Sequence, residues 1–181
     1  MLALIAGTGA LPVALVQRLE TRPLICAMAG FRPAITPDII FRIEHLGTFL
    51  EELRTRGVTE VCMAGAVTRP DIDPAQIDVA TAPLVPRIAE AIAQGDDGAL
   101  RIIIALFEEA GLHVKAAHEI APDMLPATGV LSRALVTFDH KRDAVTAEGI
   151  LTEMGEADSG QACLVRNGQV LARESRAGTD A

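Results

Sequence analysis

The chain has 181 residues, half of them apolar, and a formal net charge of −8. This length and apolar content suit one well-packed domain, or one domain with part of a second, and exclude a disordered chain. The acidic balance and the absence of Trp and Tyr argue against a general nucleic-acid binder, which needs a basic face and aromatic side chains that stack on bases. No apolar run approaches the length of a membrane-spanning helix.

Cysteine usage points to a reducing compartment. The three cysteines, Cys26, Cys62 and Cys163, are far apart and lie in apolar, strand-like runs. We interpret them as reduced core residues of a cytoplasmic protein rather than as a disulfide framework or reactive thiols. The apolar N-terminal run lacks a basic segment and is interrupted by glycine and proline, so it predicts a folded element and not a signal peptide.

The first stretch of the chain predicts a strand, a glycine turn and a helix. Leu2 to Ala6 suits a strand buried on both faces, and Gly7 and Gly9 allow a tight turn and close approach of a ligand to the backbone. Pro12 fits the first turn of the helix that follows. The turn and helix start could bind a phosphate, or they could be a plain entry turn of an α/β fold, and the motif alone leaves both interpretations open.

A dinucleotide-binding fingerprint is not complete here. It would need a third small residue where Pro12 stands and an acidic residue at the end of the second strand, residues 24–28. That strand ends in Ala29 and Gly30, so no carboxylate is present to bind a ribose 2′-OH. An oxidoreductase that uses a nicotinamide cofactor is therefore disfavoured.

The next segment alternates strands with helical periodicity. Residues 39–43 predict a short strand, and residues 58–64 predict a buried one. Between them, we expect a helix that begins at Thr48, with Glu51 completing a capping box, and ends at Gly57. Helices between strands predict an α/β fold with a parallel sheet.

Three groups after this segment are candidates for phosphate or metal binding. Arg69 follows the strand at 58–64, at the sheet edge where such folds bind ligands, and could contact a phosphate or be a solvated loop residue. Asp96 and Asp97 precede a strongly apolar helix, and one of them suits an N-cap. Two adjacent carboxylates could also hold Mg²⁺. Arg101 could pair with an aspartate or reach a phosphate.

A last strand at 113–117 and a Pro/Gly-bounded connector lead to the predicted boundary, which separates a domain at 1–129 from one at 130–181. Beyond it we expect a helix from about Arg142 to Met154. Asn167-Gly168, between two strand-like runs, is a strong hairpin signal because both turn residues must accept positive φ. One helix and one hairpin are too little for an independent core.

Five segments coincide with one known pattern: Ile5-Ala6-Gly7-Thr8-Gly9 with Leu11-Pro12, Gly65-Ala66-Val67-Thr68-Arg69-Pro70, Gly95-Asp96-Asp97 with Leu100-Arg101, Gly160-Gln161, and Gly178-Thr179-Asp180-Ala181. In this combination and order, the chain resembles the LpxI family of UDP-2,3-diacylglucosamine pyrophosphatases. The resemblance covers essentially the whole chain. It implies a Rossmann-like parallel-sheet N-terminal domain followed by part of a smaller α/β domain, with the substrate held between them.

The resemblance also implies an activity. Members are Mg²⁺-dependent enzymes of lipid A biosynthesis that hydrolyse the pyrophosphate of UDP-2,3-diacylglucosamine to UMP and 2,3-diacylglucosamine 1-phosphate (lipid X). They are cytoplasmic and peripheral to the inner membrane. The expected partners are therefore the UDP-diacylglucosamine substrate and the inner-membrane surface, with no nucleic acid and with a homodimer left open.

The resemblance implies that these segments line or face the substrate cleft, and the chemistry of pyrophosphate hydrolysis suggests a working hypothesis for the role of each residue. Asp96 and Asp97 are expected to hold Mg²⁺, and Asp97 and Asp180 to act in catalysis, with Asp180 either holding the metal or orienting the water. The implied substrate-binding residues are Gly7, Thr8, Gly9, Leu11, Pro12, Gly65, Thr68, Arg69, Arg101, Gln161 and Thr179.

Members of the family continue past the Gly-Thr-Asp-Ala segment, so we expect this sequence to stop within the second domain. Residues associated with catalysis are expected in the part that follows. Two alternatives from other classes stay open. One is a non-catalytic module that binds a nucleotide or a lipid headgroup, and the other is a structural scaffold in which the glycines serve stability alone.

Overall fold

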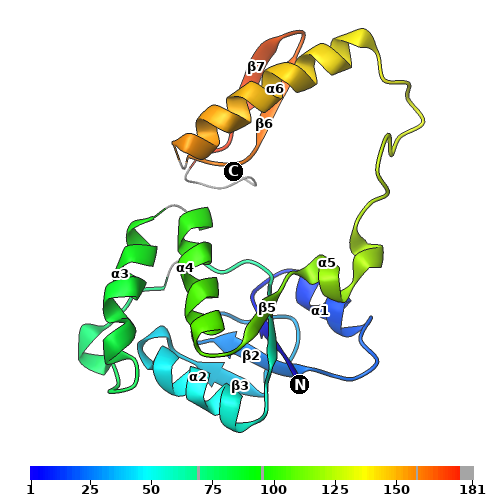
Figure 1. Cartoon of the computed structure of the whole chain (residues 1–181). Coiled ribbons are helices and arrows are strands. Elements are labelled where there is room, and N and C mark those ends of the chain that lie inside the picture. The colour runs from blue at the N-terminus through cyan, green and yellow to red at the C-terminus, as the bar shows by residue number, and fades with distance from the viewer. Residues whose placement is uncertain (69, 95, 158, 176–181) are drawn as a thin grey trace. The chain divides into compact units, whose positions relative to one another are not determined.

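A computed structural model describes residues 1–68, 70–94, 96–157 and 159–175, without the side chains of Asp96 and Asp97. The chain divides into two compact units (Figure 1). The first comprises Met1–Ala93 and Ala99–Leu125, and the second comprises Gln94–Gly98 and Pro126–Ala181. We call them the N-terminal and C-terminal units and describe each by itself.

The N-terminal unit contains a five-stranded parallel sheet in the order β3-β2-β1-β4-β5. Its strands are β1 (Leu2–Ala6), β2 (Leu24–Met28), β3 (Ile39–Phe41), β4 (Glu60–Ala64) and β5 (His113–Lys115). In register, Leu4 of β1 lies opposite Ile25 of β2 and Cys62 of β4. The predicted α/β fold is confirmed. The strand order is that of doubly wound sheets, because β2 and β3 extend the sheet on one side of β1 and β4 and β5 extend it on the other.

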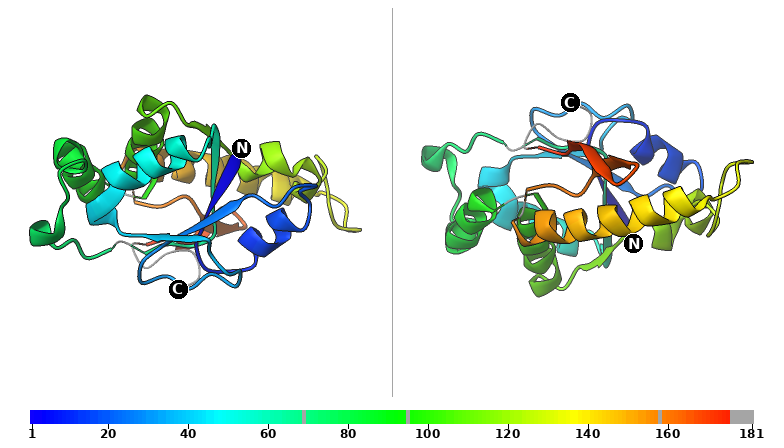
Figure 2. Two further views of the ribbon diagram at one scale, coloured as in Figure 1. Left: turned by 90° about the horizontal axis from the view of Figure 1, so that it is seen from below. Right: turned by 90° about the horizontal axis from the view of Figure 1, so that it is seen from above.

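Helices occur in three of the four connections between successive strands, and residues 29–38, between β2 and β3, contain none. The α-helices of this region are α1 (Leu11–Val16), α2 (Leu46–Thr55), α3 (Val85–Ala93), α4 (Asp96–Glu109) and α5 (Ala117–Ile120). Short 3-10 helices occur as η1 (Ile43–His45), η2 (Pro74–Gln76), η3 (Ala82–Leu84) and η4 (Pro122–Met124). Figure 2 shows α1 and α2 on opposite sides of the strands.

Each face of the sheet packs against its own apolar cluster. One cluster joins alternate strand residues such as Cys26 and Val61 to Phe49 of α2 and Phe107 of α4. The other joins the intervening strand residues to Leu15 of α1. Alternate side chains of a strand point to opposite faces, so continuous apolar runs supply both clusters. Burial raises the pKa of the Cys26 thiol to about 12, in agreement with a structural role.

The start of α2 differs from the prediction. The helix begins at Leu46, and Thr48 lies inside its first turn rather than at the N-cap. Instead of capping the helix, the Thr48 hydroxyl donates a hydrogen bond to Asp78 Oδ2 at 2.6 Å. The sequence pattern suggested a local partner, but tertiary folding brings Asp78 to this hydroxyl from 30 residues away.

The C-terminal unit contains the helix α6 (Phe138–Glu156) and an antiparallel hairpin of β6 (Cys163–Arg166) and β7 (Gln169–Arg173). Helix α6 starts earlier than predicted because the Thr137 hydroxyl accepts a hydrogen bond from His140 N and caps it. The Asn167-Gly168 hairpin is confirmed, with φ of 53° and 74° at the two turn residues. Whether the two domains divide after residue 129 stays a prediction.

Candidate functional site

Two glycine loops meet at the carboxyl ends of β1 and β4. Thr8 N donates to Ala66 O at 2.9 Å, and Ala66 N donates back to Thr8 O at the same distance. The Thr8 hydroxyl donates to Ala66 O as well, at 3.2 Å. The loops therefore form one connected surface at the strand-order reversal, which is where open α/β sheets bind ligands.

The close contact between the loops explains two of their glycines. A Cβ on Gly7 would lie 2.5 Å from Ala66 O, and a Cβ on Gly65 would lie 2.6 Å from Thr8 O. Gly65 also has a φ of +94°, which L side chains rarely adopt. Both glycines are thus required by the approach of one backbone to another, whether or not a ligand binds beside them.

The first loop uses part of its hydrogen-bonding capacity within the chain. Gly7 N donates to Ala64 O at 2.8 Å and Thr8 N to Ala66 O, so neither amide is free to donate to a phosphate. Pro12 is fully buried at the start of α1, whereas Leu11 is partly exposed. A phosphate at this loop would have to be bound by its other groups.

The second loop leads from β4 to a pocket that we call the polar pocket, because the charged residues Arg42, Glu44 and Asp71 are among those that line it. Thr68 is exposed on this loop, and Arg69 lies outside the described residues. Pro70 and Asp71, which come next, line a pocket of about 250 Å³ together with residues that follow β2 and β3. The full lining of this polar pocket is Met28, Ala29, Gly30, Arg42, Ile43, Glu44, Pro70 and Asp71. Three strands therefore contribute to it at the predicted ligand-binding edge of the sheet.

Arg42 is the cationic residue among those that line the polar pocket, and Glu44 holds it in place. Arg42 Nη2 donates to Glu44 Oε1 at 3.0 Å and Arg42 Nε to Oε2 at 3.2 Å, an arrangement in which both oxygens accept from one guanidinium. Asp73 N donates to Glu44 Oε1 at 3.1 Å. Glu44 is buried, with 3% of its side chain exposed, whereas Arg42 is about half exposed.

These contacts keep Glu44 ionised. The hydrogen bonds from Arg42 outweigh the effect of burial and, with the bond from Asp73 N, lower the pKa of Glu44 to about 2. The same pair raises the pKa of Arg42. The pocket thus presents a guanidinium whose orientation is fixed by Glu44 and whose exposed side is open to a ligand.

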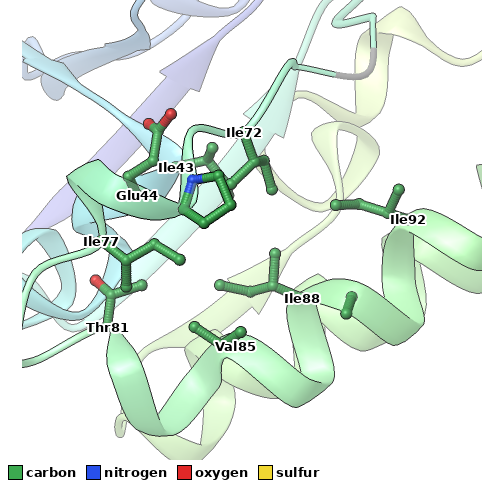
Figure 3. Close-up of a pocket in the computed structure, with 10 residues that line it drawn as sticks. Ile43, Glu44, Ile72, Ile77, Thr81, Val85, Ile88 and Ile92 are labelled. Atoms are coloured by element: carbon green, nitrogen blue, oxygen red, sulfur yellow. The ribbon is translucent and has the colours of Figure 1, made fainter.

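An apolar pocket of about 200 Å³ adjoins the polar one. Figure 3 shows the side chains that line it. The two pockets share Ile43 and Glu44. The complete lining of the apolar pocket is Ile43, Glu44, Ile72, Pro74, Ile77, Thr81, Val85, Ile88, Ala89 and Ile92. One wall is the segment between β4 and α3, and the other is α3 itself.

The remaining predicted residues lie in different units or outside the described residues. Arg101 is exposed on α4, and Gln161 is exposed in the C-terminal unit, where its N–H donates to Glu174 Oε2 at 2.6 Å. Thr179 and Asp180 lie outside the described residues, as do the side chains of Asp96 and Asp97. Within the part of the chain that is described, no three His, Cys, Asp or Glu side chains form a group suited to a metal ion.

Sequence reasoning missed the Arg42 and Glu44 pair. The signal was present, because Arg42 lies near the end of the predicted strand at 39–43 and Glu44 follows it directly. That position is the carboxyl end of a parallel strand, where polar side chains gather at ligand sites.

Comparison with known proteins relates this chain to one family. Residues 1–124 match the family described as the LpxI N-terminal domain, and residues 127–181 match the LpxI C-terminal domain. The chain is 34% identical over 186 residues to the UDP-2,3-diacylglucosamine pyrophosphatase LpxI of Caulobacter vibrioides. The match covers 99% of this chain and 66% of that relative, so the chain spans less than two thirds of the relative's length. Among the residues described here, no helix combines the length and apolar character needed to cross a membrane.

Proposed function

The chain belongs to the LpxI family, and from this premise we propose that it hydrolyses the pyrophosphate of UDP-2,3-diacylglucosamine to UMP and 2,3-diacylglucosamine 1-phosphate. The observation that carries the proposal is the match of both family domains along the chain, together with the relative of that name. The reaction adds water to one phosphorus and breaks its bond to the bridging oxygen, which leaves with the other phosphate.

The geometry of the N-terminal unit supports a substrate site at the carboxyl edge of its sheet. The joined glycine loops and the polar pocket lie at that edge, and Arg42 offers fixed donors for a phosphate oxygen. Pyrophosphate hydrolysis requires mainly a positioned water and stabilisation of the charge on the phosphoryl oxygens. An oriented guanidinium supplies part of that charge stabilisation. We add Arg42 to the predicted substrate-binding residues, which include Thr68, Arg69 and Arg101.

Mg²⁺ dependence is part of the proposal. Carboxylate oxygens are the ligands that Mg²⁺ prefers, and Asp96 and Asp97 are adjacent at the start of α4. These two residues would hold the ion, which would supply positive charge to the phosphoryl oxygens. Asp180 would orient the attacking water. Asp180→Asn should then lose turnover and keep substrate binding, and unchanged turnover would remove Asp180 from the mechanism.

The experiment that tests the proposal is release of UMP from UDP-2,3-diacylglucosamine by this polypeptide, with Mg²⁺ and again with a chelator. Release that the chelator abolishes is the expected result. Saturable UDP binding without release in either condition would favour the alternative of a non-catalytic binding module. Release that the chelator leaves unchanged would contradict the metal assignment alone.

Peripheral attachment to the inner membrane is a further proposal, because the substrate carries fatty acyl chains. Sedimentation with vesicles of anionic phospholipid tests it. Cosedimentation that increases when the vesicles contain UDP-2,3-diacylglucosamine is the expected result, because the acyl chains of the bound substrate lie in the bilayer.

A further inference from the structure

We infer that the apolar pocket of the N-terminal unit binds one fatty acyl chain of the substrate. The choice of ligand rests on the proposed function, since that substrate carries acyl chains on its sugar. The pocket itself is a feature of the fold, and the occupant is argued from its lining, its position and the rigidity of its walls.

The lining offers an acyl chain almost no polar atom. Side chains of Ile72, Ile77, Ile88 and Ile92 point toward one another across the pocket (Figure 3). Such a surface binds hydrocarbon by removing apolar area from water, and it gives a charged or hydroxylated ligand no partner. Ile92, which is 41% exposed, leaves the pocket accessible from solvent.

The two polar residues in the lining already have partners elsewhere. The Thr81 hydroxyl accepts a hydrogen bond from Gly47 N at 2.8 Å. The Glu44 carboxylate accepts from Arg42 and from Asp73 N, on the side of the polar pocket. Neither side chain therefore requires a polar ligand inside the apolar pocket.

Adjacency to the polar pocket identifies the kind of ligand. Ile43 and Glu44 form part of both linings, so a molecule with a polar end and a hydrocarbon tail could place each end in a pocket of matching chemistry. A diacylated sugar nucleotide is such a molecule. A purely polar ligand would use the polar pocket and leave the apolar one empty.

The wall opposite α3 is held in place by hydrogen bonds within the segment and to the start of α2. Asp78 accepts hydrogen bonds from the Thr48 hydroxyl and from Thr81 N, at 2.6 and 2.7 Å. His45 Nε2 lies 3.1 Å from Gln76 O. This segment is thereby fixed to the start of α2, and its isoleucines face α3 across a space that is kept open. A built apolar pocket of this kind is typical of ligand sites.

The test compares two ligands whose polar parts are identical. The probes are 2,3-diacylglucosamine 1-phosphate with long acyl chains, used below its micelle concentration, and the same compound with two acetyl groups. Calorimetry gives the Kd of each for the 181-residue chain. Because each methylene removed from water strengthens binding about fourfold, we expect the long-chain form to bind at least about tenfold more tightly.

Two variants locate the effect. Ala89→Phe fills the pocket from an exposed position of α3, and Ile92→Glu places a carboxylate at its solvent-accessible end. Each should raise the Kd of the long-chain form about tenfold and change that of the diacetyl form less than about twofold. Glu90→Phe, on the same helix but outside the lining, is the control and should leave both values unchanged. Ile92→Glu provides an independent test if Ala89→Phe does not fold.

The inference and the proposed function fail separately. The inference is overturned if the Kd of the long-chain form is no lower than that of the diacetyl form. It is also overturned if the Kd of the long-chain form for both pocket variants equals that for Glu90→Phe. Either result counts against the inference even if UMP is released. Chain-dependent binding that both variants weaken supports the inference even if no UMP is released.

Discussion

Gly7 and Gly65 show how single residues hold the candidate site together. Each supplies space for the other loop's backbone, which approaches to within 2.9 Å between the amide and carbonyl groups of Thr8 and Ala66. This is a requirement of packing between loops that are 58 residues apart in sequence. A glycine that looks like a phosphate-loop residue can therefore have a structural cause of its own.

Gly7→Ala should lower the free energy of unfolding by about 3 kcal/mol, because the new methyl group would collide with Ala66 O and the loops would have to separate. Gly9→Ala is the matched control. Gly9 has a φ of +95°, but no atom lies within 4 Å of an added Cβ. Gly9→Ala should therefore cost only about 1 kcal/mol of backbone strain. Urea denaturation followed by circular dichroism measures both, and equal losses would show that the contact between loops contributes nothing.

The ionisation of Glu44 should make the stability of the protein depend on pH. Its pKa in the folded chain is about 2, below the ordinary value of 4.5, so its contribution to stability is complete above about pH 4.5 and is lost as the pH falls toward 2. Glu44→Gln should therefore destabilise the protein at pH 7 by about 2 kcal/mol, because the bonds from Arg42 and Asp73 lose their charge-assisted acceptor.

Thermal melts of wild type and Glu44→Gln between pH 7 and pH 2 measure this contribution. The difference in Tm should shrink as the pH approaches 2. A difference that stays constant over this range would mean that Glu44 is not ionised in the folded protein.

Among the elements, the hairpin of the C-terminal unit depends on α6. Asp143 of that helix accepts hydrogen bonds from Gly168 N at 2.6 Å and Asn167 N at 2.8 Å. These bonds lower the pKa of Asp143. A carboxylate that binds both turn amides fixes the hairpin against the helix, although the Asn-Gly turn already favours the hairpin locally.

Asp143→Ala should accelerate hydrogen exchange at the amides of Asn167 and Gly168, since each loses its acceptor. Exchange in the strands of the N-terminal unit should not change. Asp139→Ala is the control, because Asp139 lies on the same helix and pairs with Arg142 rather than with the turn. Equal protection of the turn amides in both variants would contradict the role of Asp143.

At the scale of the whole molecule, an exposed segment of the C-terminal unit, which follows the N-terminal unit in sequence, can be tested by proteolysis. Between Pro126 and Thr137 the chain is exposed and contains no helix or strand. Exposed irregular segments are preferred sites of proteolysis. Limited trypsin treatment should therefore cut first after Arg133, and mass spectrometry of the early fragments identifies the site. Cleavage within α2, after Arg54, before cleavage after Arg133 would contradict the division into units.

Sequence reasoning predicted the strands and the hairpin turn more completely than the candidate site. Strand, turn and hairpin signals are local, so β1, β4 and the Asn167-Gly168 turn could be identified from neighbouring residues alone. Thr48 was assigned a local partner because a capping box is a local pattern, and its true partner, Asp78, could not be seen that way.

The sequence by itself determined the fold class, the alternation of buried strands and helices, and the family. It also determined the burial of Cys26 and Cys62. All of these depend on apolar periodicity and short motifs, which are properties of consecutive residues. Tertiary structure alone decided the strand order, the bridge between Thr8 and Ala66, and the pairing of a polar with an apolar pocket around Ile43 and Glu44. Those features arise from contacts between segments distant in sequence, and they depend on how the sheet is wound rather than on any local preference.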